Sequence, residues 1–329
     1  MTLASSGNIN MVGPDGSPRR SIGVELGDGT LVTPVSLISA GTRTLTGIPS
    51  GPIIMPGDFY GKSTAFIFND VVSSAMDNYN LQTRAVSAGW NGIKRLIATT
   101  TVNSGVVVSS LYDTIAAMTE DTGSYPSGST WSIINNGVIV GAGGNGANTP
   151  AVSGASISAG YAGQQGGTGF KVAASNLSSL SITNNGTIAG GGGGGGSGGG
   201  AYYDTGKTGG TYGAAGGGGG GGAGRVNGDG TGGTGGAASG NSNNFPGANG
   251  ANGSYSSAGA GGAGGSGTGV AGGNGGAGGA WGTAGTAGAA GVGSSSSAGG
   301  GSGGAAGYSV DGYSYINWIT VGTLTGPTV

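Results

Sequence analysis

The sequence contains no cysteine and no histidine among its 329 residues. These absences exclude disulfides, thiolate nucleophiles, zinc sites of the usual kind and the side chain that most readily transfers protons near neutral pH. We therefore expect no enzyme activity, no metal ion and no cofactor. The lack of disulfides also fits folding in a reducing cytoplasm, where we expect the chain to be made.

Charged residues are also scarce, at 7% of the chain. The chain has 10 basic and 12 acidic residues and a net charge of −2, so we expect neither nucleic acid nor an anionic membrane as a partner. No apolar run is long enough for a signal peptide or a membrane span, which predicts no membrane insertion. The following acidic residues are interpreted as solvated surface charges: Asp58, Asp70, Asp77, Asp113, Glu120 and Asp121.

Glycine dominates what is present, and 67 of the 87 glycines fall between residues 141 and 307. Composition changes at about residues 63 and 140, which predicts a β-rich module over 1–63, a β-rich domain over 64–140, a glycine-rich domain over 141–307 and a closing β-segment over 308–329. A short helix is expected at Tyr112–Met118. Strands of the second domain are expected at Ala65–Phe68, Leu96–Thr100, Gly105–Val108 and Trp131–Ile134.

The glycine-rich stretch has two interpretations, a flexible linker or an ordered scaffold. Order is favoured because pure glycine tracts at Gly190–Gly196 and Gly216–Gly222 alternate with clustered aromatic residues. Every third residue from Gly273 to Gly291 is glycine, which matches an extended helix with three residues per turn. Several such helices can pack side by side through backbone hydrogen bonds, with glycine wherever two backbones come close.

A second repeat precedes the glycine tracts. Ser132–Gly141 and Ser181–Gly190 share the pattern Ile-x-Asn-Asn-Gly-x-Ile-x-Gly at a spacing of 49 residues. Asn-Gly between β-branched residues is typical of a tight turn in which both residues tolerate positive φ. We therefore expect each copy to form a hairpin that leads into the glycine-rich chain.

Two stretches resemble known phage proteins. Residues 21–63, ending in Phe59-Tyr60-Gly61-Lys62-Ser63, resemble an N-terminal module of tailed-phage structural proteins. The second Asn-Asn-Gly copy, its glycine tract and Ala306–Ile316 look like the adhesins that cap long tail fibres of T-even-type phages, and this resemblance covers 131–329. It implies a mostly β fold with a sandwich of polyglycine II helices, and a non-enzymatic virion protein at the tail-fibre tip, made in the host cytoplasm.

The resemblance also implies partners and contact residues. We expect the protein to join other tail proteins, such as a trimeric fibre or tail tip, through Phe59, Tyr60 and Lys62, and to bind a bacterial outer-surface protein or glycan. Aromatic side chains give large contact area at low entropic cost, although they could instead seal the sandwich. Receptor contact is predicted for Tyr202, Tyr203, Asp204, Lys207, Tyr212, Asn244, Phe245, Tyr255 and Trp281.

Other functions remain open from the sequence. The nearest alternative is a purely structural tail protein with no direct receptor contact. More distant ones are a polyglycine-type antifreeze protein, a glycine-rich cell-surface protein of mycobacterial type and a depolymerase.

Overall fold

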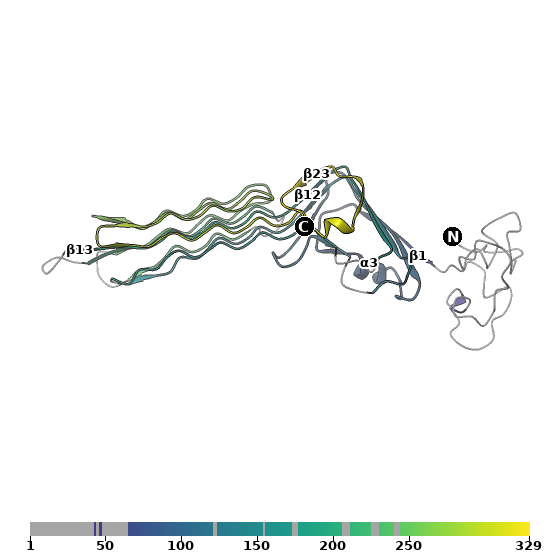
Figure 1. Cartoon of the computed structure of the whole chain (residues 1–329), viewed down its shortest axis with the longest axis horizontal. Helices are drawn as coiled ribbons and strands as arrows, with labels where there is room; N and C mark the ends of the chain where they lie inside the picture. Colours follow the sequence, from purple (N-terminus) through teal and green to yellow (C-terminus); the bar gives the residue numbers. More distant parts are fainter. Residues whose placement is uncertain are drawn as a thin grey trace, which may run out of the picture.

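The computed structural model describes Arg43, Thr46, Gly47 and most of residues 65–329, with gaps at 121–123, 154, 173–176, 206–210, 225–229 and 240–243. The predicted tail-attachment residues Phe59, Tyr60 and Lys62 lie outside the described residues, as does most of the module over 1–63. In Figure 1 the described chain is elongated, with a strand-built body joined to a long bundle of extended segments.

The strand-built body is a parallel β-helix with three faces, because each turn of the chain adds one strand to each face in succession. The first face has the order β1 (Ala65–Val72), β4 (Arg95–Val102), β7 (Thr130–Asn135), β11 (Ser179–Asn184) and β22 (Asn317–Thr320). The second has β2 (Met76–Asp77), β5 (Val107–Ser109), β8 (Val138–Val140), β12 (Thr187–Ala189) and β23 (Thr323–Thr325). The third has β3 (Tyr79–Asn80), β6 (Met118–Thr119), β10 (Phe170–Lys171) and β21 (Val310–Asp311).

Alternating strands build the core of the β-helix. In β4 and β7 every second side chain is buried, as the period-2 pattern of these apolar runs predicts. Large rings from successive turns then stack inside: Tyr79 lies 6.1 Å from Trp131, and Trp131 lies 5.9 Å from Phe170. The prediction of a mostly β fold is confirmed, and its strand runs correspond to β1, β4, β5 and β7.

The α-helix that follows β3 was not predicted, and the helix that was predicted was expected elsewhere. This α-helix is α3 (Leu81–Ser87), which begins after Asn80, whose side-chain oxygen accepts a hydrogen bond of 2.8 Å from the Thr83 N–H. The expected helix at Tyr112–Met118 is absent. That stretch is a turn leading to Met118, which pairs with β3 and β10, and sheet pairing there outweighs local helix propensity.

The Asn-Asn-Gly repeat forms a corner of the β-helix, so the predicted hairpins are wrong. β7 and β8 flank the first copy but belong to different faces, and each pairs in parallel with the strand 49 residues later. Inside the corner, the buried Asn135 Nδ2 donates to Asn184 Oδ1 at 2.8 Å. Gly186 has no positive φ; glycine is needed because a Cβ would lie 2.0 Å from the Gly137 carbonyl oxygen.

This corner predicts unequal effects for two neighbouring asparagines. Asn184→Ala removes a buried acceptor, so Asn135 Nδ2 keeps only its 3.2 Å bond to the Thr187 carbonyl and the Val321 carbonyl loses a donor. We therefore expect the free energy of unfolding to fall by about 1–3 kcal/mol. The matched control is Asn185→Ala, since the Asn185–Asn136 bond is exposed. Thermal or denaturant unfolding of both variants measures the difference. Equal losses of stability in the two variants would show that the buried Asn135–Asn184 bond does not stabilise the corner more than the exposed bond does.

The glycine-rich chain enters the fold as two insertions into the β-helix. The chain leaves after β8 and returns at β10, then leaves after β12 and returns at β21. We refer to residues 141–169 and 190–309 together as the glycine bundle. Strands β10, β11 and β12, which lie within the stretch 141–307, are therefore part of the β-helix, and the closing segment supplies its last turn as β22 and β23.

Backbone hydrogen bonds between extended segments hold the bundle together. All eleven N–H groups of residues 190–200 donate to other segments, and the direction of donation repeats every third residue. Successive donors reach three described segments: Gly191 and Gly194 reach 158–169, Gly192 and Gly195 reach 215–224, and Gly193 and Gly196 reach 283–291. The carbonyls of residues 190–200 accept from three further segments, 141–149, 272–282 and 298–307, so this segment is surrounded on all sides.

The fraction of glycine in each segment rises with the number of other segments packed against its backbone. A Cβ on Gly194 would lie 1.9 Å from the Asn145 carbonyl oxygen, so a surrounded segment tolerates almost no side chains. Residues 216–222, also bonded on several sides, are likewise all glycine. The segment 272–282, which lies between two surrounded segments, has two glycines in three, whereas the outer segment 283–291 has one in three.

Asparagine side chains complete the outer segments of the bundle. Some backbone N–H groups of the outer segments have no backbone carbonyl beside them. An asparagine side-chain oxygen accepts their hydrogen bond instead, so the N–H is satisfied without a further neighbouring segment. Examples are Asn249 accepting from Gly235 N, Asn252 from Gly232 N and Asn274 from Gly264 N, at 2.9, 2.9 and 3.0 Å.

The packing predicts a strong position dependence for glycine-to-alanine changes. Gly194→Ala places a methyl group on a backbone oxygen and should lower stability by at least the roughly 1–3 kcal/mol typical of overpacking. Gly299→Ala is the control, because a Cβ there meets nothing within 4 Å. Differential scanning calorimetry of the two proteins gives the comparison. A Gly194→Ala protein as stable as the Gly299→Ala protein would rule out the packing described above.

Candidate functional site

The end of the bundle farthest from the β-helix is a small cap built of short strands, labelled by β13 in Figure 1. Here the extended segments reverse direction, about 30 Å from the β-helix if each residue rises about 3.1 Å. We call this end the distal cap. One sheet has β16 (Asn244–Phe245), β14 (Thr211–Ala214), β13 (Ala201–Asp204) and β20 (Ser296–Ser297), and another has β17 (Ser266–Gly267), β18 (Val270–Ala271) and β19 (Val292–Gly293).

Three of the predicted contact aromatics help to hold the distal cap together. Tyr203, Tyr212 and Phe245 pack against a small core of buried alanine and valine side chains. The Tyr203 and Tyr212 rings stack with centroids 6.1 Å apart. The Phe245 ring occupies the place of a side chain at Gly267, where a Cβ would lie 1.8 Å from it. These rings are half-buried, so only part of each is open to a partner.

Tyr202 and Asp204 belong to the same strand and, two residues apart, share one face of it. Asp204 is exposed, and its backbone N–H donates to Ser295 Oγ at 2.9 Å. Partial desolvation and then the neighbouring Asp204 carboxylate raise the pKa of Tyr202 above its ordinary value. Lys207, predicted to act beside them, lies outside the described residues. Asn244 accepts a hydrogen bond from Gly213 N at 3.1 Å and so fastens β16 to β14.

Tyr255 and Trp281 lie at the opposite end of the bundle, beside the β-helix. The Trp281 indole N–H donates to the Tyr255 carbonyl at 2.5 Å, and the two rings meet edge to face with centroids 4.9 Å apart. Gly282, the next residue, donates to the Gly190 carbonyl, where the bundle leaves β12. The nine predicted contact residues are therefore not one cluster, because the chain reverses at both ends of the bundle.

The distal cap also contains a turn that the sequence analysis did not select. Val292, in β19, is 70% exposed, and Ser294 and Ser295 join β19 to β20 beside β13; we call Val292–Ser295 the Val292 turn. The signal was present in the sequence as Ser294–Ser297, which interrupts the run of glycine triplets. This turn has no aromatic residue, so the clusters of aromatic residues in the sequence do not mark it.

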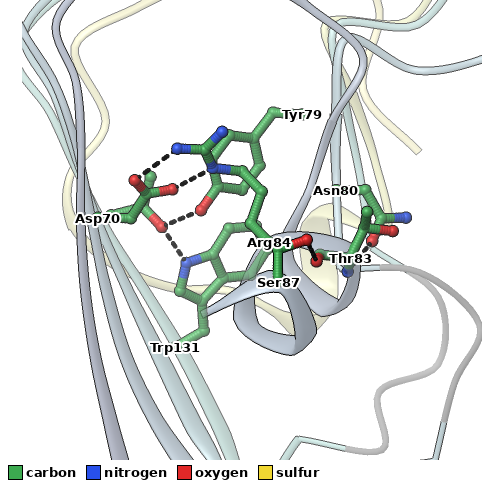
Figure 2. A network of polar contacts seen from close by, with 8 residues as sticks. Asp70, Tyr79, Asn80, Thr83, Arg84, Ser87 and Trp131 are labelled. Carbon is green, nitrogen blue, oxygen red and sulfur yellow. Dashed lines mark hydrogen bonds and ion pairs between the residues drawn. The ribbon is translucent and has the colours of Figure 1, made fainter. Parts of the chain in front are cut away.

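A buried polar network lies at the other end of the molecule, in the first turns of the β-helix (Figure 2). Arg84 donates to both carboxylate oxygens of Asp70, from Nε to Oδ2 and from Nη2 to Oδ1 at 2.7 Å, and its guanidinium lies 5.5 Å from the centroid of the Tyr79 ring. The Tyr79 hydroxyl and the Trp131 indole N–H both meet Thr100 Oγ1, at 2.8 and 2.9 Å. Asp70 is thus buried and paired, and its interpretation as a solvated charge is wrong; Glu120 is also buried, at 2% exposure.

A hollow of about 570 Å³ adjoins this network, lined by Asp70, Arg84, Asn78 and Asn80 among others. The Asp70 hydrogen bond raises the pKa of Arg84, and burial raises that of Tyr79, so both groups keep their protons. The ion pair anchors α3 to β1. In the described part of the chain, no group of three or more acidic side chains could hold a metal ion. No helix among the described residues is long and apolar enough to cross a membrane.

Comparison with known proteins identifies the family. The family described as phage tail fibre adhesin Gp38 matches residues 68–329, which is most of the chain. The chain belongs to the Gp38 family of phage tail fibre adhesins. Among solved structures, the gp37–gp38 adhesin tip complex of the bacteriophage S16 long tail fibre matches with 22% identity and a TM-score of 0.45. That match covers 88% of this chain and 91% of the other. Comparison with curated protein sequences gives no match.

The family assignment confirms the resemblance noted over residues 131–329 and extends it. Residues 68–130, which the sequence analysis related to no known protein, belong to the same Gp38 adhesin unit. This agrees with the fold, because β1 to β6 are the first two turns of the β-helix that carries the glycine bundle. The resemblance of residues 21–63 to a tail module lies outside the matched range and stays a prediction.

The distal cap predicts coupling between two side chains of β13. Asp204→Asn removes the negative charge that disfavours the tyrosinate form, so the pKa of Tyr202 should fall toward its ordinary value of about 10. Tyr255 is an internal control, since burial alone raises its pKa. NMR titration of tyrosine ring carbons measures both. A fall at Tyr255, or none at Tyr202, would contradict the arrangement of β13.

Proposed function

We propose that this Gp38-family adhesin binds a bacterial outer-surface protein or glycan through its distal cap, on a rigid polyglycine II scaffold. The observation that carries the proposal is the distribution of large and charged side chains. Between its two ends the bundle carries mainly glycine, alanine, serine and small amides, whereas Tyr202, Tyr203 and Asp204 gather where the segments reverse. Partly exposed aromatic rings and an exposed charge on a rigid support favour specific contact.

Rigidity supports this role for the distal cap. Backbone hydrogen bonds tie the central segments on all sides, and the cap has its own small core, so little conformational entropy is lost when a partner binds. The proposed receptor contacts are Tyr202, Asp204 and the Val292 turn, together with Lys207, which follows Asp204 by three residues in the sequence. Tyr203, Tyr212, Asn244 and Phe245 position them and contribute their open edges. Tyr255 and Trp281 brace the bundle against the β-helix.

Attachment to the tail is proposed for the opposite end of the chain. The module over residues 1–63, with Phe59, Tyr60 and Lys62, would join other proteins of the tail fibre, and the β-helix would hold the bundle away from that joint. The protein would then sit at the distal tip of the fibre in the virion, after synthesis in the host cytoplasm. We propose no catalytic role, because Asp70 and Arg84 are paired with each other and adhesion needs no bond cleavage.

Phage adsorption tests the proposal. Phage carrying Tyr202→Ala with Asp204→Ala should adsorb at least about 10-fold more slowly, because loss of interface hot spots typically costs about 2 kcal/mol or more. The matched control is Tyr112→Ala, which changes a tyrosine with 59% exposure on the β-helix. Equal melting temperatures would show that the cap variant is folded. Unchanged adsorption and host range in the cap variant would favour a purely structural tail protein.

A further inference from the structure

A polar groove runs along one side of the glycine bundle, away from the distal cap. It encloses about 300 Å³, and its floor is the segment 141–149, with Gly146 and Ala147 at the bottom. One wall is the segment 158–169, which contributes Tyr161 and Gln164, and the other is the stretch 230–236, which contributes Thr231. Backbone hydrogen bonds hold both walls to the floor. Gln164 N donates to the Asn145 carbonyl at 2.9 Å, and Gly146 N donates to the Thr231 carbonyl at 2.8 Å.

Amide and hydroxyl groups line this groove in a repeating pattern. Asn145 Oδ1 accepts from the N–H and the hydroxyl of Thr231, both at 2.8 Å, and three residues later Asn148 Oδ1 accepts in the same way from Thr234. Asn145 Nδ2 then donates to Gln164 Oε1 at 2.8 Å. These bonds hold the side chains in position before any ligand arrives. The amide nitrogens of Asn148 and Gln164 have no acceptor among the described residues, so both can donate to a ligand.

Tyr161 is the large side chain of the groove. It is 59% exposed, although two hydrogen bonds to Ser197 hold its backbone: its N–H donates to Ser197 Oγ at 2.8 Å, and its carbonyl accepts from Ser197 N at 3.0 Å. An exposed aromatic ring on a rigid backbone offers a flat apolar face at low entropic cost. Packing inside the protein does not account for this ring, since most of it faces solvent.

Among the described residues that line the groove, the only ionisable group is the tyrosine hydroxyl. A charged ligand would lose its hydration there without gaining an opposite charge, which disfavours anions and cations alike. A neutral sugar matches all three features, because its apolar ring face can lie on Tyr161 and its hydroxyls can pair with amide and hydroxyl groups. The three-residue repeat of asparagine and threonine, about 9 Å along an extended helix, suits a chain of sugars rather than one ring.

We propose that this lateral groove is a second binding site, one that takes a stretch of uncharged oligosaccharide from a bacterial surface polysaccharide, with Tyr161 as the stacking platform. The site is separate from the distal cap and does not depend on the function proposed for the cap. It would give the particle a weak contact along the side of the fibre tip while the cap reaches its receptor.

Glycan binding by the full chain tests this site. The purified protein is applied to an immobilised panel of neutral oligosaccharides of hexoses, 6-deoxyhexoses and N-acetylhexosamines, with uronate and phosphorylated oligosaccharides as the acidic arm. The best neutral ligand is then titrated by calorimetry. We expect neutral oligosaccharides to bind, Tyr161→Ala to weaken binding at least 10-fold and Gln164→Ala to weaken it about three- to 10-fold. Tyr112→Ala, with the same 59% exposure on the β-helix, should stay within twofold of the parent protein.

Three outcomes would overturn the proposal: no neutral oligosaccharide bound at millimolar concentration, stronger binding to the acidic arm, or a Tyr161→Ala affinity within twofold of the parent. Equal melting temperatures of the variants ensure that a loss reflects the groove. The cap variant Tyr202→Ala with Asp204→Ala separates the two sites, because it should keep saccharide binding even where adsorption is lost. Saccharide binding lost in that variant but kept in Tyr161→Ala would assign the sugar to the cap.

Discussion

The close approach of one extended backbone to another is the constraint on which the rest of this structure depends. A segment such as 190–200 hydrogen-bonds to neighbours on every side, and a Cβ on most of its residues would lie about 2 Å from a carbonyl oxygen. Glycine is therefore required even though it loses the most backbone entropy on folding. The stability of the glycine bundle comes from many backbone hydrogen bonds, each of modest net strength, and not from a large apolar core. Side chains can then appear only at outer edges and at the ends.

The β-helix aligns the segments of the glycine bundle with one another at the point where they begin. Both insertions begin at the same corner, after β8 and β12, which are parallel neighbours. The pairing continues beyond the strands, since Gly141 N donates to the Ala189 carbonyl and Gly190 N to that of Thr325. The buried Asn135–Asn184 bond holds successive corners one above the other. The first residues of each insertion thus start side by side, which lowers the entropic cost of bringing distant glycine tracts together.

The same constraint explains why function divides between ends and edges. At the ends, where segments reverse, bulky residues can form a cap, and in the distal cap Tyr203, Tyr212 and Phe245 cover a core of only three buried side chains. Along the edges, asparagine and threonine complete the hydrogen bonds of outer segments, and their remaining polar groups line a groove beside Tyr161. A rigid backbone array with variable ends and edges can therefore change its binding chemistry without changing its scaffold.

The sequence by itself determined the local periods. Alternating apolar residues predicted β1, β4 and β7, the pure glycine tracts marked the surrounded segments, and the 49-residue repeat marked two turns that lie one above the other. Only the tertiary structure decided which of these segments lie next to one another in space. Asn-Asn-Gly proved to be a corner rather than a hairpin because its partners come from neighbouring turns, and Trp281 is far from Tyr202 because the bundle reverses at both ends. The spacing of apolar residues and glycines is a property of consecutive residues and can be read from the sequence. Which segments are neighbours in space depends on where a long chain reverses direction.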